Sequence, residues 1–360
     1  MVNNKRLLFL EDMRRIYNSV TDIERIRNKV FLVTGATGML ASYMVFFLIW
    51  LNEECDFNLR IIVNCRNEIK CKEKFGKYVE CDWFVMSIED ISEFDYSSDC
   101  VDRIDYIIHA ASLANSYLYG KYPVETILPN VKGTTNLLNY CRDNPSTRLL
   151  FLSSTSIYGD NNEREYLIEE STSVLDISTP GNYYGISKLC GEALCKAYFL
   201  EYGVSARTVR IAHSYGPTMD CDNDTRVFAE FVKNATNGDN IKIRSSGNAK
   251  RMFCYASDCI SGMLYALLHG EDGESYNLAN PEQEYSIREL AELIAYDIME
   301  RKVNIEYVEQ DTKEYSPTNK QSLSKVSVEK LKKLGWKYSV NAKNGFMRTI
   351  MILMGNCEDK

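Results

Sequence analysis

Short apolar runs of strand length alternate along the chain with longer segments of helical periodicity. The strand-like runs lie at residues 30–33, 59–64, 83–86, 106–109, 149–152 and 206–211. Two strong helical patterns fall between them, at residues 39–50 and 187–202. This alternation is typical of a doubly wound parallel sheet with helices on both faces. The pattern therefore predicts an α/β domain over residues 29–212.

Two other segments depart from this alternation. Beyond residue 216, helical patterns at 225–237, 257–268 and 286–299 are separated by loops, which predicts a smaller C-terminal substrate-binding domain over residues 213–360. At the other end, charged and apolar residues interleave at helical spacing through residues 1–28. This spacing predicts an amphipathic helical extension that packs on the body of the protein or on a partner subunit.

Composition narrows the class of protein. A length of 360 residues exceeds the usual size of a single core, in line with two domains. The net charge of −8 gives no basic surface, so nucleic acid is not an expected partner. The twelve cysteines are scattered without metal-ligand spacing, which favours reduced thiols, no metal site and a cytoplasmic location. The most apolar stretch, residues 39–51, is too short to cross a bilayer, and residues 1–28 lack a signal-peptide pattern, so no membrane association is expected.

A glycine-rich turn follows the first predicted strand. Gly35, Gly38 and Ala41 are spaced as in the G-x-x-G-x-x-[GA] phosphate loop, directly before an apolar helix. Glycine lets the backbone approach a pyrophosphate, and the helix N-terminus offers unpaired N–H groups and a positive dipole end. An ordinary strand-to-helix turn is the alternative. The dinucleotide interpretation of a Rossmann domain assigns cofactor binding to Gly35, Thr37, Gly38 and Met39.

Tyr184 and Lys188 are four residues apart in a predicted helix, so both side chains lie on one face. A free tyrosine titrates near pH 10, and a nearby ammonium lowers that pKa. Lowering it by about three units corresponds to about 4 kcal/mol of differential stabilisation, which a nearby cation and an oxidised nicotinamide could supply. The pair predicts acid–base chemistry coupled to hydride transfer, with both residues also contacting the cofactor.

The segment Phe-Leu-Ser-Ser-Thr-Ser-Ile-Tyr-Gly at 151–159 completes a set of motifs with the glycine turn and the Tyr-x-x-x-Lys pair. With these motifs the chain resembles the extended short-chain dehydrogenase/reductase family, in its nucleotide-sugar epimerase, dehydratase and decarboxylase branch, over residues 29–336. The resemblance implies that Ser154 hydrogen-bonds the reacting oxygen, that Tyr184 is the acid/base, and that Lys188 assists it and binds ribose. It also implies NAD or NADP as cofactor, a nucleotide-diphosphate sugar as substrate, and a homodimer.

The same resemblance suggests residues that bind the substrate. Arg251 matches a family arginine that contacts the diphosphate, and Arg226 begins the preceding helix. His213 stands where the family normally carries asparagine, so either phosphate binding or a buried structural role fits it. Asn130 matches an asparagine that organises the active site, with helix capping as the alternative, and Thr155 follows the reactive serine. A surface salt bridge is the alternative for each arginine.

The adenosine end departs from the NAD-specific pattern. No acidic residue ends the second strand, and Arg66 lies close by, which favours NADP unless Arg66 covers the adenine or faces solvent. Ser87 stands where the family often has an aspartate against adenine, and Ile88 suits packing on that ring. His109 is expected to shape the cofactor pocket together with Ala110 and Ala111.

The residues after Ser154 bear on the net reaction. Dehydratases of the resembled family carry an Asp-Glu pair there and decarboxylases carry glutamate at the second position, whereas this chain has Thr155 and Ser156. The hydroxyl groups of Thr155 and Ser156 cannot replace a carboxylate as a base near neutral pH. The sequence therefore favours a C4 epimerase that works through a 4-keto sugar. An NADP-dependent 4-ketoreductase is the main alternative, followed by a dehydratase or decarboxylase and, last, a dinucleotide-binding protein without catalysis.

Overall fold

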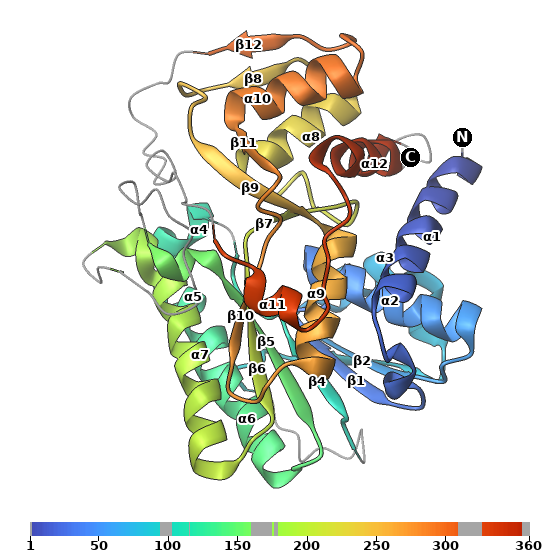
Figure 1. Ribbon diagram of the computed structural model, residues 1–360, viewed down its shortest axis with the longest axis vertical. Coiled ribbons are helices and arrows are strands. Elements are labelled where there is room, and N and C mark those ends of the chain that lie inside the picture. The colour runs from blue at the N-terminus through green and yellow to red at the C-terminus, as the bar shows by residue number, and fades with distance from the viewer. Residues whose placement is uncertain are drawn as a thin grey trace.

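The computed structural model describes residues 2–93, 103–114, 116–159, 175, 179–308 and 326–354. Within these ranges, no helix combines the length and the hydropathy that a bilayer crossing requires. Figure 1 shows a larger lower part built on one sheet and a smaller upper part, with α9 between them.

The larger part is built on a parallel sheet of seven strands in the order β10-β6-β5-β4-β1-β2-β3. All six predicted strands are confirmed, within one or two residues at their ends. The seventh strand, β10, lies far along the chain and was not predicted; it pairs with β6. The strands are β1 (Val30–Thr34), β2 (Arg60–Cys65), β3 (Phe84–Ile88), β4 (Tyr106–His109), β5 (Arg148–Ser154), β6 (Ala206–Ile211) and β10 (Ser275–Leu278).

Helices cover both faces of this sheet, as a doubly wound fold requires. One face packs against α2 (Met39–Cys55) and the almost entirely buried α9 (Ala256–His269), and the other against α6 (Thr134–Asp143) and α7 (Tyr183–Tyr202). The shorter helices are α3 (Glu68–Phe75), α4 (Ser116–Lys121) and α5 (Pro123–Leu128). The Rossmann fold class is thereby confirmed.

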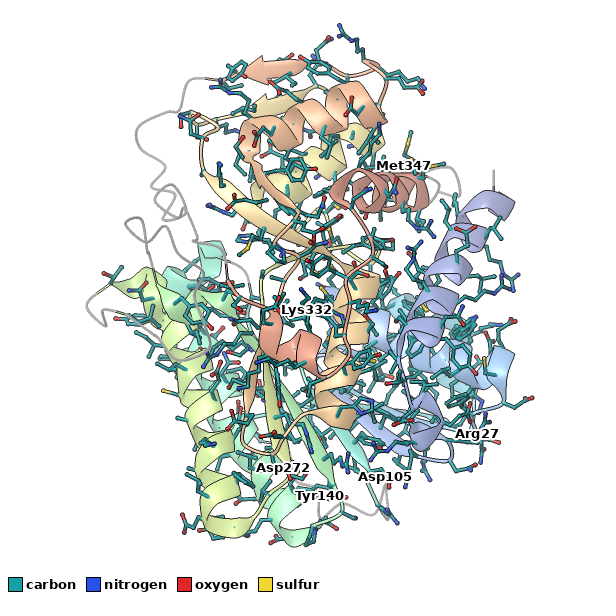
Figure 2. The ribbon with its side chains drawn as sticks, in the orientation of Figure 1. Arg27, Asp105, Tyr140, Asp272, Lys332 and Met347 are labelled. Carbon is teal, nitrogen blue, oxygen red and sulfur yellow. The ribbon has the colours of Figure 1, made fainter. Side chains whose placement is uncertain are left out.

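The amino ends of the strands lie away from the smaller part. Asp105 and Asp272, which precede β4 and β10, appear there together with Tyr140 and Arg27 (Figure 2). The carboxyl ends of the strands therefore face the smaller part, and ligands of open α/β sheets bind at that edge.

The smaller part has its own core of buried apolar side chains. The helices predicted there are present, but the expected loops between them contain strands. Two small sheets form, in the orders β11-β9-β7 and β12-β8. Its elements are β7 (His213–Tyr215), α8 (Val227–Asn237), β8 (Ile241–Ile243), β9 (Lys250–Tyr255), β11 (Glu284–Ser286), α10 (Ile287–Glu292) with a π-helical continuation (Leu293–Ile298), β12 (Ile305–Tyr307) and α12 (Ala342–Met354).

The chain crosses between the two parts more often than a boundary at residue 213 implies. Both α9 and β10 follow that residue and yet pack with the larger sheet, as does α11 (Glu329–Lys333) against β10. Residues 309–325 and 355–360 of the predicted domain lie outside the described residues. The predicted division of the chain at residue 213, with substrate bound by the C-terminal part, therefore stays a prediction.

The predicted N-terminal extension is helical, as α1 (Val2–Ser19) and a 3-10 turn (Ile23–Ile26). Its apolar face is buried through Met13 and Ile16, and Figure 1 shows α1 beside α12 and α2. It packs on the body of its own chain.

One charged residue of this extension is buried rather than exposed. The carboxylate of Asp12 accepts hydrogen bonds from Tyr43 of α2 at 2.9 Å and Tyr255 of β9 at 2.6 Å, and it pairs with Arg348 of α12 at 3.0 Å. Burial raises the pKa of Asp12 above its usual value, while these partners act in the opposite direction. We call Asp12, Tyr43, Tyr255 and Arg348 the Asp12 cluster; it joins both parts of the molecule to both ends of the chain.

Candidate active site

A cavity of about 1820 Å³ opens at the carboxyl ends of the parallel strands, between the two parts of the molecule. Its wall includes the glycine turn after β1, the ends of β2, β4 and β5, the start of α7 and the loop after β7. The cavity thus brings together segments that are far apart in the sequence. Its size suits a dinucleotide with a second ligand beside it.

The glycine turn is shaped for a close approach. Gly35 has φ +61°, and a Cβ there would lie 2.7 Å from Cα of Ala111, so a side chain cannot be accommodated. The Gly38 N–H donates to the Gly35 carbonyl at 2.9 Å, and Gly38 caps α2 without a side-chain hydrogen bond. Gly35, Thr37, Gly38 and Met39 all line the cavity, so the residues present fit the phosphates of a dinucleotide.

His109 holds the adjacent strand ends together. Thr34 Oγ1 accepts the N–H groups of Ala110 and Ala111 at 3.2 and 3.1 Å, so its hydroxyl donates to His109 Nδ1 at 2.8 Å. His109 Nε2 then carries the proton and donates to Thr134 Oγ1 at 3.1 Å. Burial and the cation of Lys188 lower the pKa of His109 to about 3. His109 is therefore a neutral structural link, while Ala110 and Ala111 line the cavity.

Ser154, Tyr184 and Lys188 meet in the cavity wall. Ser154 ends β5, and the other two residues occupy the first turns of α7. Ser154 Oγ accepts the backbone N–H of Ser156 at 3.1 Å. Lys188 Nζ donates to the Leu152 carbonyl at 2.6 Å and lies 5.8 Å from the ring centre of Tyr184. The fold thus brings the three predicted residues together in one cavity wall, and their role in proton transfer stays a prediction.

Burial opposes the electrostatic effect predicted for this pair. Burial raises the pKa of Tyr184, with the Ser154 hydrogen bond and the charge of Arg226 lowering it in part. Burial also lowers the pKa of Lys188 to about 7, against the opposing effect of Glu192. Loss of water disfavours the charged form of both groups. The predicted lowering of the Tyr184 pKa relied on an oxidised nicotinamide as well as on Lys188, and it stays a prediction.

Tyr119 covers the ring of Tyr184 and was missed by the sequence analysis. The two rings stack with centroids 4.7 Å apart and an interplanar angle of 2°. Both line the cavity. Tyr119 lies on α4 in a segment without a motif, so only the fold identifies it. It restricts the positions that the Tyr184 phenol can adopt.

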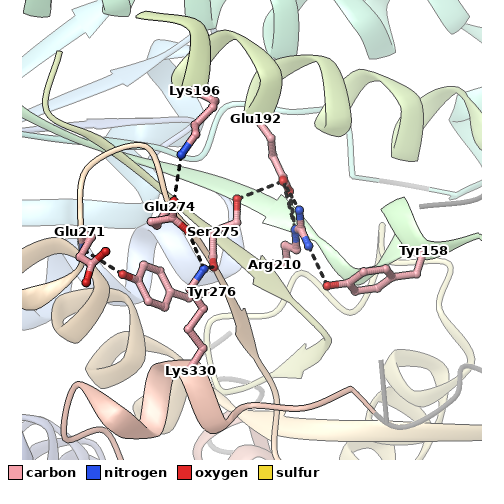
Figure 3. Close-up of polar contacts among 9 residues, drawn as sticks. All are labelled: Tyr158, Glu192, Lys196, Arg210, Glu271, Glu274, Ser275, Tyr276 and Lys330. Atoms are coloured by element: carbon pink, nitrogen blue, oxygen red, sulfur yellow. Dashed lines mark hydrogen bonds and ion pairs between the residues drawn. The ribbon is translucent and has the colours of Figure 1, made fainter. Parts of the chain in front are cut away.

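Behind the reaction centre, a buried ion pair ties α7 to the sheet (Figure 3). Glu192, one turn after Lys188, binds Arg210 of β6 with a shortest contact of 2.7 Å. Arg210 also donates to the Tyr158 hydroxyl at 2.9 Å, which fixes the turn after Ser154. Nearby, Glu274 binds Lys196 and Lys330 at 2.9 and 2.8 Å. The spacing of Lys188 and Glu192 was visible in the sequence, but the partner from β6 was not.

Three of the five residues expected to bind substrate line the cavity: Thr155, His213 and Arg226. Arg226 Nε donates to Asp224 at 2.9 Å, and its guanidinium lies 4.6 Å from the ring centre of Phe228. His213 Nδ1 is buried and has no hydrogen-bond partner among the described residues. Burial, reinforced by the nearby arginines, lowers the pKa of His213 well below its usual value. A neutral imidazole with one unpaired nitrogen can bind a polar ligand group.

The other two residues expected to bind substrate, Arg251 and Asn130, lie behind the cavity wall. Arg251 is buried on β9, where Nη1 donates to the Lys250 carbonyl at 2.8 Å, and Asn130 is buried in a π-helical turn (Pro129–Gly133). The Asn130 amide donates to Ser187 of α7 at 2.9 Å and to Ser112 after β4 at 3.0 Å. Within the described residues, neither lines the cavity. Asn130 thus packs α7 against β4.

The adenosine end predicted from the sequence differs from the structure at four residues. Asp90 and Ile91 line the cavity there, whereas among the described residues Ser87 and Ile88 do not. Ser87 instead donates to the Glu89 carboxylate at 2.6 Å, because β3 continues to Ile88 and the chain turns into the cavity only afterwards. Arg66 lines the cavity as expected; its guanidinium is exposed and lies 3.8 Å from Asp90.

The sequence of the chain is similar to a known family and to individual named proteins. The family described as "NAD dependent epimerase/dehydratase family" matches residues 31–279. UDP-glucuronic acid decarboxylase 6 of Arabidopsis thaliana is 29% identical over 322 residues, which cover 88% of this chain and 87% of the relative. UDP-glucuronic acid decarboxylase 1 of Xenopus tropicalis is 28% identical over 77% of this chain and 62% of its own length.

Solved structures share the fold. UDP-glucose 4-epimerase from Thermotoga maritima superposes with a TM-score of 0.76 at 21% identity, covering 91% of this chain and 99% of that one. dTDP-glucose 4,6-dehydratase from Bacillus anthracis, in complex with NAD, gives a TM-score of 0.74 at 21% identity, covering 92% and 98%. One fold therefore serves both epimerases and dehydratases, and residues of the site must distinguish the reaction.

Proposed function

Since the chain belongs to the NAD dependent epimerase/dehydratase family, we propose that it is a nucleotide-sugar epimerase that acts through a 4-keto intermediate. The observation that carries the proposal is one cavity wall in which Ser154, Tyr184 and Lys188 adjoin the glycine turn. Hydroxyl residues, Thr155 and Ser156, follow Ser154 where elimination would need carboxylates.

The proposed role of each residue follows from its position in the cavity. Tyr184 accepts the proton of the sugar hydroxyl and later returns it, and Ser154 holds the reacting oxygen by a hydrogen bond. Lys188, about half protonated at neutral pH, stabilises the phenolate when it carries its charge. A dinucleotide held with its phosphates on the turn from Gly35 to Met39 would supply hydride acceptance and return through its nicotinamide. The sugar ring presents its other face before the return, so the product is the C4 epimer and no atom is lost.

On the substrate side, Arg226 and the unpaired nitrogen of His213 are proposed to bind the diphosphate. A guanidinium provides several N–H donors in a fixed plane, which suits phosphate oxygens. Asp224 forms an ion pair with Arg226, which reduces the net positive charge that this guanidinium offers to a phosphate. Arg251 is proposed to act indirectly, because its positive charge helps to lower the pKa of His213.

A second candidate, decarboxylation of a nucleotide uronate, is favoured by the similarity to UDP-glucuronic acid decarboxylases over 88% of the chain. A 4-keto uronate is a β-keto acid, so oxidation at C4 alone prepares the loss of carbon dioxide. Against it, Ser156 stands where the resembled decarboxylases carry glutamate. The two candidates share the first step and differ in the fate of the ketone.

Product analysis tests the proposal. We would incubate the protein with UDP-, GDP-, CDP- and dTDP-hexoses and with UDP-glucuronate, adding NAD or NADP, and identify the sugars by NMR and mass spectrometry. A parallel reaction would combine a 4-keto nucleotide sugar with NADPH to detect ketoreduction. A C4 epimer formed with catalytic cofactor is expected. A 4-keto-6-deoxy sugar, a pentose with carbon dioxide, or stoichiometric use of added NADPH would each replace it with dehydration, decarboxylation or ketoreduction.

A homodimer also stays a proposal. The helices α5 and α7 pack together and expose the apolar side chains of Val124, Leu128 and Leu200. Exposed apolar side chains on these helices suit burial against a second copy. Light scattering at micromolar concentration should give twice the chain mass, and Leu200→Glu should shift it to one.

A further inference from the structure

One lysine of α3 is set apart from the others on that helix. Lys74 lines the cavity and is mostly shielded from solvent, whereas Lys72 is half exposed and pairs with Glu68 at 2.6 Å. Among the described residues, Lys74 forms no ion pair within 4.0 Å. Burial lowers its pKa, and the carboxylate of Asp220 opposes that effect only from a distance. A desolvated cation without a close partner is unfavourable unless an anion joins it.

The position of this ammonium is fixed beside the glycine turn. Lys74 Nζ donates to the Thr218 carbonyl at 3.4 Å, and the Thr218 hydroxyl donates to the Met39 carbonyl at 2.8 Å. Met39 is the first residue of α2, whose N-terminal N–H groups have no side-chain cap. The ammonium and the helix N-terminus therefore border the same region of the cavity, and both favour negative charge.

Other charged groups share this stretch of wall. Lys70, one turn earlier on α3, and Arg66 at the end of β2 also line the cavity, and so do Glu73 and Asp220. The carboxylates of Glu73 and Asp220 oppose an anion in the open cavity, so it must lie close to the cations and to the backbone N–H groups. Of the three cations, Lys74 alone is held by a contact to the loop that touches α2.

We propose that Lys74 binds a phosphate group of the dinucleotide, so that this phosphate lies between the glycine turn and a cation supplied by α3. The assignment rests on cofactor binding in the proposed function and is independent of the net reaction. The phosphate is either the pyrophosphate bridge, nearest Met39, or the 2′-phosphate of NADP, nearest Arg66. The shared chemistry is a phosphate oxygen accepting from the ammonium.

Binding measurements on the full-length protein test this. Dissociation constants for NAD and for NADP would be measured by calorimetry with wild type, Lys74→Met, Lys74→Arg and the control Lys72→Met, at low salt and at high salt. Lys74→Met should weaken binding by about tenfold or more, the usual range for a charge-assisted hydrogen bond. Lys74→Arg should restore most of it, and Lys72→Met should match wild type. The weakening should shrink at high salt, because salt screens a lost charge contact.

The pattern across cofactors identifies the phosphate. Equal weakening for NAD and NADP indicates the pyrophosphate, and weakening for NADP alone indicates the 2′-phosphate. Unchanged binding of both cofactors by Lys74→Met would overturn the proposal. The proposal would also be overturned if Lys74→Met weakened cofactor binding equally at low and high salt and Lys74→Arg did not restore it. That result would indicate that the substitution displaces the loop around Thr218. A protein that fails to epimerise sugars but shows the expected binding pattern would refute the proposed reaction and leave this site intact.

Discussion

The reaction centre and the Asp12 cluster both bury ionisable groups, yet they treat them differently. In the Asp12 cluster a single carboxylate is surrounded by two phenols and a guanidinium from three other elements. In the reaction centre, Tyr184 and Lys188 are desolvated beside an open cavity, and the pKa of Lys188 falls to about 7. A buried charge that is paired with other groups of the chain fixes a fold, whereas ionisable groups beside a cavity can exchange protons with a ligand. The first region should therefore govern stability and the second activity.

The largest expected effect is on catalysis. Tyr184→Phe removes the proton-carrying oxygen with little change in shape, so kcat should fall by about 10²- to 10⁴-fold. The unfolding free energy should stay within about 1 kcal/mol of wild type, because the stacked ring is kept. Steady-state kinetics and urea unfolding measure the two quantities, with Tyr183→Phe as the control. Full activity in Tyr184→Phe would refute the assigned acid/base.

The next effect is on stability. Asp12→Ala leaves Arg348 and two phenols without their acceptor and should lower the unfolding free energy by about 3–5 kcal/mol. Asp12→Asn keeps an acceptor of similar shape and should lose less. The folded fraction of Asp12→Asn should retain wild-type kcat. A large loss of kcat at unchanged stability would show that this cluster belongs to the catalytic machinery and end the contrast.

A smaller effect concerns pH. Lys188 has a folded pKa of about 7, below its unfolded value, so between pH 7 and pH 10 the unfolded chain binds a proton that the folded protein lacks. Stability from this group therefore rises with pH over that window. Between pH 7 and pH 9 the gain should be about 2 kcal/mol. Comparing urea unfolding of wild type and Lys188→Met at both pH values isolates it; equal pH dependence in both proteins would contradict the assignment.

The smallest effect tests the aromatic stack. An aromatic pair contributes about 0.5–1.5 kcal/mol, so Tyr119→Leu should lower kcat by about three- to tenfold if the stack positions Tyr184. Tyr119→Phe keeps the ring and should behave as wild type. A loss of kcat in Tyr119→Phe equal to that in Tyr119→Leu would assign the role to the Tyr119 hydroxyl instead.

The sequence predicts most reliably what is local. The β1 strand, the turn at Gly35 and the start of α2 are adjacent in the chain and carry their own periodicity, so they were predicted to within one residue, whereas α2 runs five residues past its predicted end at Trp50. Tyr184 and Lys188 were likewise found because one helix fixes their spacing. In contrast, β10 is a four-residue strand whose pairing with β6 spans much of the chain, and no local pattern reveals it.

Burial is the main property that the sequence does not give. Asp12 reads as one polar residue among many, and its partners come from residues 43, 255 and 348. The burial that raises the pKa of Tyr184 was not visible for the same reason, although the predicted spacing to Lys188 was correct. Near this edge, Asp90 and Ile91 line the cavity in place of the predicted Ser87 and Ile88, because the end of β3 depends on its pairing with β2.

The central claim is an alcohol–ketone cycle at C4 that returns every atom to the sugar. The most direct test supplies a nucleotide hexose with deuterium at C4 and follows the product by NMR and mass spectrometry. The account predicts a C4 epimer that retains its deuterium at C4 and its original mass. Loss of that deuterium to solvent or to another carbon, or a product lighter by water or carbon dioxide, would contradict it.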